Sequence, residues 1–548
     1  MPSHRSSPAR ERVTTGGVLR FLLILAGLLT ILFFTFPVFF HGLVFSYLVR
    51  NFAYVFWIVI LGAVFIPMAV HYLRRGAPTI GFALIVADVV LMVGGMGILA
   101  GIEQAKIAQM AKYELMDQLP AVSREHVRYT PLQVAEQEIS RRTQSSQRAI
   151  EEVIPLSGPK GPMYIAPLIV NGVVNMYLGQ NQGFEVFDDA GTVDNGLDRV
   201  SLIDTPEFQV GDEMEIFDNL DRRLILDVGF FNTYPRTYYA PIYKEDGVTV
   251  DEVVGIVPYI SYTFWWGFLL PEWGGVAVFH ADGTIENLTP AEAQQSEKLA
   301  HVDRLFPSWL AEKWVYAQPF DQGWLSGYIR RDDKIEVPRL EDQNQMPFYL
   351  LMEDGTSQYI TMTEPDGPSF ALRKIYYTDA RTGTSRVYAY NDKENILGPA
   401  KAVSMAKSVT GYTWYEDHGQ GGSSGSYRII EPRPVTRGGE LYYMYSIVPK
   451  DYGTVVATVF VNAATSKTIG PFTSRDDAFA WLLERPNASA VNTAVAATIE
   501  GNAGTTTQSA ASTCEQFIAV CEQIEQICPS TSNTAAVTPA PEPTPTSP

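Results

Sequence analysis

The sequence predicts a membrane-anchored α+β protein, in which three N-terminal transmembrane helices precede an extracytoplasmic domain of repeated antiparallel hairpin-plus-helix units. Three observations lead to this fold class. Three long apolar runs lie close together near the N-terminus, and the arginines beside them are unevenly placed. Farther along the chain, β-rich segments with the same turn chemistry recur at intervals.

Three apolar runs fill most of the first hundred residues. The runs 21–47 and 52–73 contain no Asp, Glu, Lys or Arg, and the run 76–102 contains only Asp88. A helix needs about 20 apolar residues to cross about 30 Å of hydrocarbon, so each run is long enough to span a membrane. The first run is also too long for a cleaved signal peptide. We therefore predict a transmembrane anchor over residues 18–102, preceded by a cytoplasmic tail of residues 1–17.

The arginines indicate how this anchor is oriented. Four precede the first run, two separate the second and third runs, and one separates the first and second: Arg5, Arg10, Arg12, Arg20, then Arg74 and Arg75, and Arg50. Basic residues that flank transmembrane helices stay on the cytoplasmic side. We therefore expect a multi-pass protein of the cell membrane with a cytoplasmic N-terminus and an extracytoplasmic C-terminal domain.

The two parts of the chain differ in charge. Residues 1–102 contain seven Lys or Arg and two Asp or Glu, a net charge of +5, whereas the whole chain carries −19. The remaining residues therefore carry −24. An acidic surface of this kind repels nucleic acid, which we exclude as a partner.

Asp88 is the single acidic residue in the three runs. A carboxylate in hydrocarbon is costly, so it marks either a functional site or a polar contact with a neighbouring helix. Two interpretations stay open: a protonated Asp88 bonded to another helix, and a residue of a proton or ion path. Nearby, Gly97 and Gly101 form a G-x-x-x-G pair, which favours close helix packing within the anchor or dimerisation.

Residues 103–160 are predicted to form a juxtamembrane helical linker. We expect its first helix to extend to about Leu119. Thr130 followed by Pro131 is typical of a helix start, with Thr as the N-cap and Pro at the first helical position. This second helix is expected to end near Val153.

Residues 161–486 contain a loosely repeated order of Tyr-rich strand, hairpin and helix start. The Tyr-rich strands are expected at 163–167, 237–241, 347–351 and 441–445. The hairpins, at 186–193, 278–285, 376–383 and 459–465, turn at Asp, Asn or Gly, which tolerate the positive φ of tight turns. Helices are expected to start at Thr289, Gly398 and Ser474. We favour an inherited duplication over independent hairpins with similar turns.

The segment Asp379-Ala380-Arg381-Thr382-Gly383 resembles the hairpin of PepSY domains, in which a helix packs on a small antiparallel sheet. The order of pieces over residues 130–485 is also similar to that of large, mostly uncharacterised bacterial membrane proteins with PepSY-like repeats outside the membrane. Two turns depart from the pattern, since 462–466 has no Gly and 280–283 is shorter. The resemblance implies a module that binds or inhibits peptidases or serves within an envelope protein, and it carries over no catalytic residue.

An aromatic stretch within this domain contains Trp265, Trp266, Phe268 and Trp273. It is either a buried strand pair or an exposed contact patch, because Trp and Tyr suit both the lipid headgroup region and protein interfaces.

After the domain, the composition changes. We predict a flexible linker over 487–511, a short Cys-bearing helix over 512–528 and a Pro/Thr-rich tail over 529–548. Cys514, Cys521 and Cys528 are spaced by seven and lie about 10.5 Å apart along one helix face, too far to pair within one straight helix. They either form interchain disulfides of a homo-oligomer, or stay reduced or pair with another protein. Asn287 and Asn487 match the glycosylation pattern.

Three motifs of known chemistry are missing from the sequence. It contains no H-x-x-x-H metal pair, no H-E-x-x-H motif and no phosphate loop with Lys, and the Gly- and Ser-rich stretch 421–426 is interpreted as a loop. We therefore predict no catalytic, cofactor or metal site. The expected function is a non-catalytic binding or scaffold protein of the cell envelope, with an envelope protein or peptide as its partner. A regulatory subunit of a membrane transporter or protease complex is the first alternative, and an envelope hydrolase with an unrecognised site is the second.

Overall fold

The chain is α+β and divides into two compact units, residues 1–485 and 486–548. The computed structural model describes residues 15–122, 127–143, 148–150, 152–158, 161–170, 183–189, 200–203, 208–211, 214, 218–244, 246, 249–329, 335–338, 340, 346–366, 369–391, 394–415 and 425–484. All of these belong to the first unit. Asn487 and the predicted helix with Cys514, Cys521 and Cys528 lie outside the described residues.

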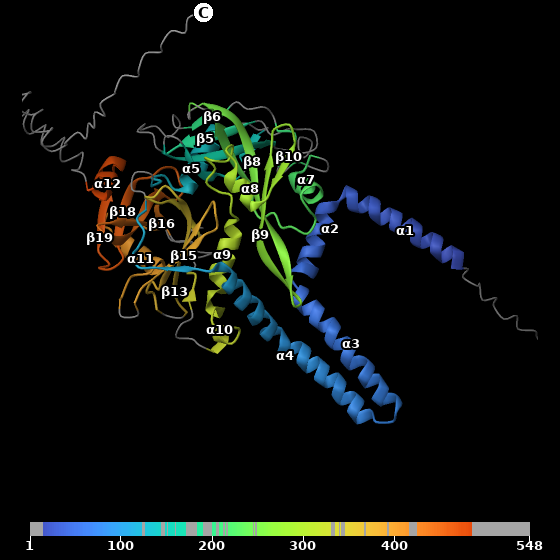
Figure 1. Cartoon of the computed structure of the whole chain (residues 1–548). Coiled ribbons are helices and arrows are strands. Elements are labelled where there is room, and N and C mark those ends of the chain that lie inside the picture. The colour runs from blue at the N-terminus through green and yellow to red at the C-terminus, as the bar shows by residue number, and fades with distance from the viewer. Residues whose placement is uncertain are drawn as a thin grey trace, which may run out of the picture. The chain divides into compact units, whose positions relative to one another are not determined.

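Two helices, α3 (Phe52–Arg74) and α4 (Pro78–Ala111), are long and apolar enough to cross a membrane. They form an antiparallel pair in which Gly81 of α4 lies against α3 (Figure 1). A Cβ atom at Gly81 would come within 2.6 Å of Leu73 Cγ, so the close approach requires glycine. The second and third apolar runs are thus confirmed as long apolar helices.

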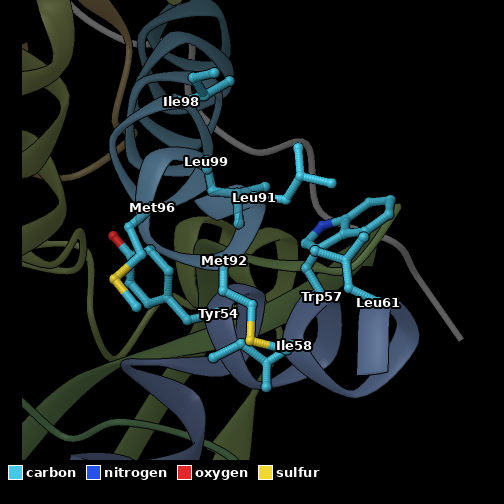
Figure 2. A pocket seen from close by; sticks show the side chains of 10 residues that line it. Tyr54, Trp57, Ile58, Leu61, Leu91, Met92, Met96, Ile98 and Leu99 are labelled. Carbon is cyan, nitrogen blue, oxygen red and sulfur yellow. The ribbon is translucent and has the colours of Figure 1, made fainter. Parts of the chain in front are cut away.

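The domain-side half of this helix pair contains a small apolar cavity. Its volume is about 130 Å³, and both helices contribute side chains to it, including Tyr54 and Trp57 of α3 and Met92 and Met96 of α4 (Figure 2). Polar groups contribute little to its wall, which suits a space filled by lipid or by neighbouring apolar side chains.

The first apolar run forms a broken helix. It comprises α1 (Thr15–Thr35), α2 (Pro37–Leu43) and a π-helix (Val44–Val49), with a bend of 98° between Leu22–Thr35 and Pro37–Val49. Pro37 is the first residue after the break, where its fixed φ and missing N–H suit a helix start. The third transmembrane span therefore stays a prediction.

The juxtamembrane predictions are wrong in two respects. The helix ends at Ala111 instead of Leu119, because Lys112 adopts a left-handed conformation (φ 44°) and the chain continues as β1 (Glu114–Met116). The second helix, α5 (Leu132–Arg142), is shorter than predicted, and Thr130 is not its N-cap. Pro131 holds that position, and the Leu132 N–H is bonded by the carboxylate of Glu431 from a distant strand.

The first sheet follows α5 and has strand order β2-β4-β5-β6, with β3 also paired to β4. Its strands are β2 (Arg148–Ile150), β3 (Ile154–Gly158), β4 (Gly161–Val170), β5 (Phe184–Asp188) and β6 (Val200–Ile203). Ala135 and Ile139 of α5 pack on Tyr164 and Phe187 of this sheet. Residues 148–150, which were predicted to extend α5, instead pair with β4 as β2, and Val153 completes the core beneath the helix.

The second sheet contains a long hairpin. Its order is β10-β9-β8-β7, and it is preceded by α7 (Leu220–Asp227) and followed by α8 (Pro290–Gln295). The strands are β7 (Tyr238–Tyr243), β8 (Val250–Trp265), β9 (Phe268–Phe279) and β10 (Ile285–Leu288). The β8–β9 hairpin extends from the β-rich region to α3 (Figure 1).

The third sheet joins α4 to the β-rich region, because β1, which follows α4, pairs with β15 in parallel. Its order is β1-β15-β14-β13-β11, with β12 also paired to β13. The strands are β11 (Ile335–Glu336), β12 (Phe348–Leu351), β13 (Ser357–Pro365), β14 (Lys374–Asp379) and β15 (Ser385–Ala389). Before them come α9 (Ser308–Ala317), a 3-10 turn (Gln318–Phe320) and α10 (Ser326–Ile329). Helix α9 packs along the end of α4.

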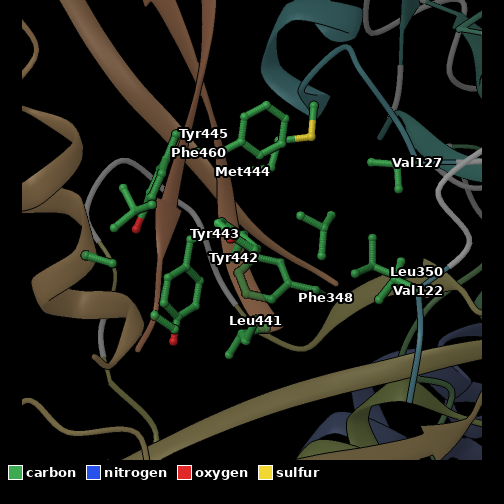
Figure 3. Close-up of a cluster of buried hydrophobic side chains, with 14 of the residues drawn as sticks. Val122, Val127, Phe348, Leu350, Leu441, Tyr442, Tyr443, Met444, Tyr445 and Phe460 are labelled. Atoms are coloured by element: carbon green, nitrogen blue, oxygen red, sulfur yellow. The ribbon is translucent and has the colours of Figure 1, made fainter. Parts of the chain in front are cut away.

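The fourth sheet shares a core with the third. Its strands run in the order β16-β17-β18-β19, and α11 and α12 pack on it. The elements are β16 (Tyr427–Arg437), β17 (Glu440–Pro449), β18 (Ala457–Asn462), β19 (Thr468–Phe472), α11 (Pro399–Ala406) and α12 (Arg475–Leu482). Figure 3 shows Phe348 and Leu350 of β12 in the same buried cluster as Tyr443 and Phe460.

The local predictions for this domain hold where the structure describes them. The four Tyr-rich segments lie in β4, β7, β12 and β17, one in each sheet. Thr289 forms the predicted capping box with Glu292, Ser474 caps α12, and Gly398 precedes α11. At the β18–β19 turn, which lacks Gly, Ser466 takes the left-handed conformation (φ 57°). The inherited duplication remains a prediction.

Glu364 forms a pH-dependent contact between the third sheet and α11, the helix that packs on the fourth sheet. Its carboxylate lies at the end of β13 and accepts a hydrogen bond from Ala400 N in the first turn of α11 (3.2 Å). Burial raises the pKa of Glu364 from about 4.5 to about 7. The folded chain therefore binds this proton more tightly than the unfolded chain does. The protonated carboxyl group makes its full contribution to the stability of the folded chain below about pH 4.5, and this contribution is lost as the pH rises through about 7.

Glu364→Gln is expected to flatten part of the protein's pH dependence. The variant's amide oxygen still accepts the hydrogen bond from Ala400, but it carries no titratable proton. When the pH rises from about 5 to about 8, the free energy of unfolding of the unmodified protein should therefore fall by about 1–2 kcal/mol more than that of the variant. Denaturation of the purified protein in detergent at both pH values measures the difference. Parallel pH profiles for the two proteins would contradict the assignment.

Candidate functional site

A cavity of about 570 Å³ lies where the four sheets meet. One or two strands of each sheet line it, namely β3, β7, β12 with β13, and β16, together with α5 and α9. Ligand pockets form preferentially at such junctions between packed units. Its walls combine aromatic side chains with several charged ones, so it is the strongest candidate for a binding site in the described part of the chain.

Arg304 is the most unusual residue of this cavity. Its side chain is only 5% exposed, and its guanidinium stacks on the ring of Tyr349, 3.7 Å from the centroid, with the ring of Tyr238 5.1 Å away. Its Nε and Nη2 atoms have no hydrogen-bond partner among the described residues. Buried donors of a charged group that lack acceptors are costly, and an anionic ligand would satisfy them.

Arg128 brings a second guanidinium to Tyr349, at its backbone oxygen instead of its ring. Its Nη2 donates to the backbone oxygen of Tyr349 (3.4 Å) and its Nη1 donates to the Tyr164 hydroxyl (3.5 Å). The Nε atom of Arg128 is buried and has no hydrogen-bond partner among the residues that the structure describes. Burial raises the pKa of Tyr349, so its phenol, which stacks on Arg304, stays neutral.

Acidic side chains also line the cavity, but two of the four are already engaged. Glu152 forms an exposed ion pair with Arg236, and Glu431 binds Leu132 N and Arg433. Glu136 is exposed, and burial raises the pKa of Glu312. The cavity can therefore offer both buried cationic groups and carboxyl groups to one ligand.

A buried network of charged groups supports the wall behind Arg128. Arg433 is fully buried, and its guanidinium donates to the backbone oxygens of Arg128 and Tyr129 and to Ser446 Oγ (2.6 Å). Its Nε lies 3.6 Å from the carboxylate of Glu431. This network fixes the segment that carries Arg128 to β16 and β17.

Two backbone features set the geometry of this network. A β-bulge shifts the β16–β17 register between Ile430 and Arg433, and Glu431 within it has φ of 50°. A bulge redirects a side chain, here toward the N–H of Leu132 at the start of α5. On the other side of the same segment, the buried Asp189 accepts from the backbone N–H groups of Tyr129 and Thr130 (2.7 and 3.0 Å).

The structure divides the predicted aromatic patch into buried and exposed residues. Phe268 is buried, and Trp273 is half-buried against Phe306. Trp265 packs on Phe268 beneath Lys106, whose ammonium lies 4.7 Å from the Trp265 ring. Trp266, at the turn, is 77% exposed. Each of the two interpretations therefore describes part of this stretch.

The remaining predicted sites are separate from the cavity. Asp88 is 6% exposed within α4, and its Oδ1 has no hydrogen-bond partner in the described part of the chain. Asn287 lies exposed on β10, where its side-chain oxygen accepts from the Tyr259 hydroxyl (3.0 Å).

Sequence reasoning missed the charged residues that define the cavity and its support: Arg128, Arg304, Asp189, Glu431 and Arg433. One signal was present in the sequence. Glu431 and Arg433 interrupt an otherwise apolar segment, where charged residues are almost never buried unless paired.

Comparison with models of known protein families gave no match, and a search of curated proteins found no significantly similar sequence. The resemblance to PepSY domains therefore stays a prediction.

Proposed function

We propose that this chain is a membrane-anchored, extracytoplasmic binding protein of the cell envelope, and that its central cavity binds the carboxylate group of a peptide. The anchor comprises α3, α4 and the broken first helix as a third span, with the N-terminus in the cytoplasm. The arginine distribution supports this orientation, because Arg74 and Arg75 lie at the end of the α3–α4 pair that is farthest from the β-rich region (Figure 1).

Arg304 is the observation that carries the binding proposal. A guanidinium presents a planar fork of donors that matches a carboxylate, and a charge-assisted pair is stronger in a site shielded from water. The aromatic rings of Tyr238, Tyr349 and Trp309 provide apolar surface for the adjoining part of a peptide. Glu136 and Glu312 provide carboxyl groups for its ammonium or amide groups.

Arg304→Met is expected to weaken peptide binding by about 10- to 100-fold, because it removes about 1.5–3 kcal/mol of charge-assisted hydrogen bonding. The probe is a pooled library of tripeptides with free C-terminal carboxylates, compared with the same library as C-terminal amides. Thermal unfolding of the full chain in detergent measures binding, since a ligand that binds only the folded state raises the melting temperature. Only the acid library should stabilise the unmodified protein.

A matched variant controls for the loss of an arginine. Arg223→Met removes an exposed arginine that pairs with Asp227 on α7, away from the cavity, and it should bind like the unmodified protein. Equal stabilisation by acids and amides, or unchanged binding in Arg304→Met, would contradict the carboxylate site.

Asp88 supports a second candidate function, a regulatory subunit of a membrane transporter or protease complex. Its Oδ1 is buried without a described partner within a helix long enough to span a membrane, where ionisable residues mark functional sites by default. Asp88→Asn should leave tripeptide binding unchanged if the cavity acts alone. A loss of binding in this variant would instead couple the anchor to the cavity and favour the regulatory role.

A further inference from the structure

Two short segments outside the long helices expose large apolar side chains close to the anchor. The first is the turn between β8 and β9, and the second is α10 with the two residues before it. Their exposed residues, called the interfacial patch from here on, are Phe264, Trp266, Trp324, Leu325, Tyr328 and Ile329. Trp266 is 77% exposed and Ile329 is 65% exposed, although the surfaces of soluble monomeric proteins rarely expose clusters of large apolar side chains.

Each segment is fixed against one helix of the pair. At the hairpin turn, Phe264 stacks edge-on against Phe52 and Phe56 of α3, with centroids 6.1 and 5.9 Å apart. On the other helix, the Tyr328 hydroxyl donates to Gly97 O of α4 (2.8 Å). A Cβ atom at Gly101 would lie 2.9 Å from the Tyr328 ring, so the glycine makes room for α10.

These two attachment points lie at the same height along the helix pair. Gly62 of α3 faces Met92 of α4. Phe56 lies six residues before Gly62, and Gly97 lies five residues after Met92, which places them about 9 Å and about 7.5 Å above that contact. The hairpin turn and α10 therefore approach the anchor at one level, from α3 and from α4 respectively (Figure 1).

That level matches the far boundary of a bilayer. Eighteen residues separate Phe56 from Arg74, and at about 1.5 Å per residue they span about 27 Å. The hydrocarbon core of a membrane is about 30 Å thick. With Arg74 at one interface, the interfacial patch lies at the other. Lys106, above the Trp265 ring, is suitably placed for the headgroup region.

We propose that the interfacial patch inserts into the lipid at the boundary between headgroups and acyl chains, in the leaflet that faces the β-rich domain. This inference rests on the proposed membrane anchor. Trp and Tyr favour this depth because each ring is apolar with one polar group, and Leu and Ile favour the acyl chains below it. The domain is thereby seated on the membrane at two points beside the helices, which fixes the orientation of its cavity relative to the lipid surface.

Spin labels on the full chain test this insertion. The cysteines at 514, 521 and 528 are first replaced by Ser, and single cysteines are introduced as Trp266→Cys and Ile329→Cys. Leu202→Cys, an exposed position on β6 far from α3 and α4, is the aqueous control, and Val59→Cys, exposed on α3, is the lipid control. The protein is reconstituted into vesicles of phosphatidylcholine and phosphatidylglycerol. Collision rates with oxygen, which concentrates in lipid, and with a water-soluble nickel chelate are then measured.

Labels at residues 266 and 329 are expected to give an oxygen-to-nickel collision ratio several-fold above that at 202 and close to that at 59. A ratio equal to that at 202, with 59 still in lipid, would overturn the insertion while leaving the anchor intact. Protection of 266 and 329 from both reagents would also overturn it, since a second copy or another protein would then cover the patch. If 59 itself were accessible to nickel, the proposed anchor would fail, and the insertion with it.

Discussion

Arg433→Met is expected to lower the free energy of unfolding by about 3–5 kcal/mol. The substitution leaves Glu431 as a buried carboxylate without its cation, and it removes donors from the backbone oxygens of Arg128 and Tyr129 and from Ser446. Unpaired buried charges and unsatisfied acceptors are among the few mechanisms that give losses this large. Chemical denaturation of the purified chain in detergent measures the change.

Two further variants separate this effect from a general loss of positive charge. The double variant Arg433→Met with Glu431→Gln removes both charges, so it should recover part of the loss, because no uncompensated ion remains. Arg223→Met breaks an exposed pair and should cost less than about 1 kcal/mol. If Arg433→Met also lowered the free energy of unfolding by less than about 1 kcal/mol, the network would have no structural role.

Local signals in the sequence predicted much of the domain. The Thr289 capping box, the Ser474 cap and the Tyr-rich strands depend on neighbouring residues, and the structure contains them at the predicted positions. The two long apolar helices were also evident, because length and hydrophobicity alone define them. Such features require no knowledge of distant contacts.

Errors arose where distant contacts decide the structure. The N-terminus of α5 is satisfied by Glu431, almost three hundred residues away, so the local capping signal at Thr130 was misleading. Similarly, the residues after Arg142 pair with β4 instead of extending the helix, because strand pairing completes the core. The break at Pro37 was not predicted, because the uniformly apolar composition of residues 21–47 does not show where a helix bends.

The candidate cavity could not be predicted, because its residues come from segments that are distant in sequence. Arg128 and Arg304 approach the same tyrosine, Tyr349, only when the four sheets assemble. No short motif joins them, unlike the spacing of a metal or phosphate site. The predicted interchain disulfides of Cys514, Cys521 and Cys528 lie outside the described residues and stay a prediction, as do the alternatives of a regulatory subunit and a hydrolase.

The orientation of the domain is the central claim, and protease added outside intact cells or spheroplasts tests it most directly. The chain carries an epitope tag at its N-terminus for detection. We expect complete digestion of the part that follows Ile102 and a protected, tagged fragment of about the first hundred residues, because Arg5 to Arg20 and Arg74–Arg75 stay in the cytoplasm. A C-terminal domain that survives until the membrane is permeabilised with detergent would contradict the account.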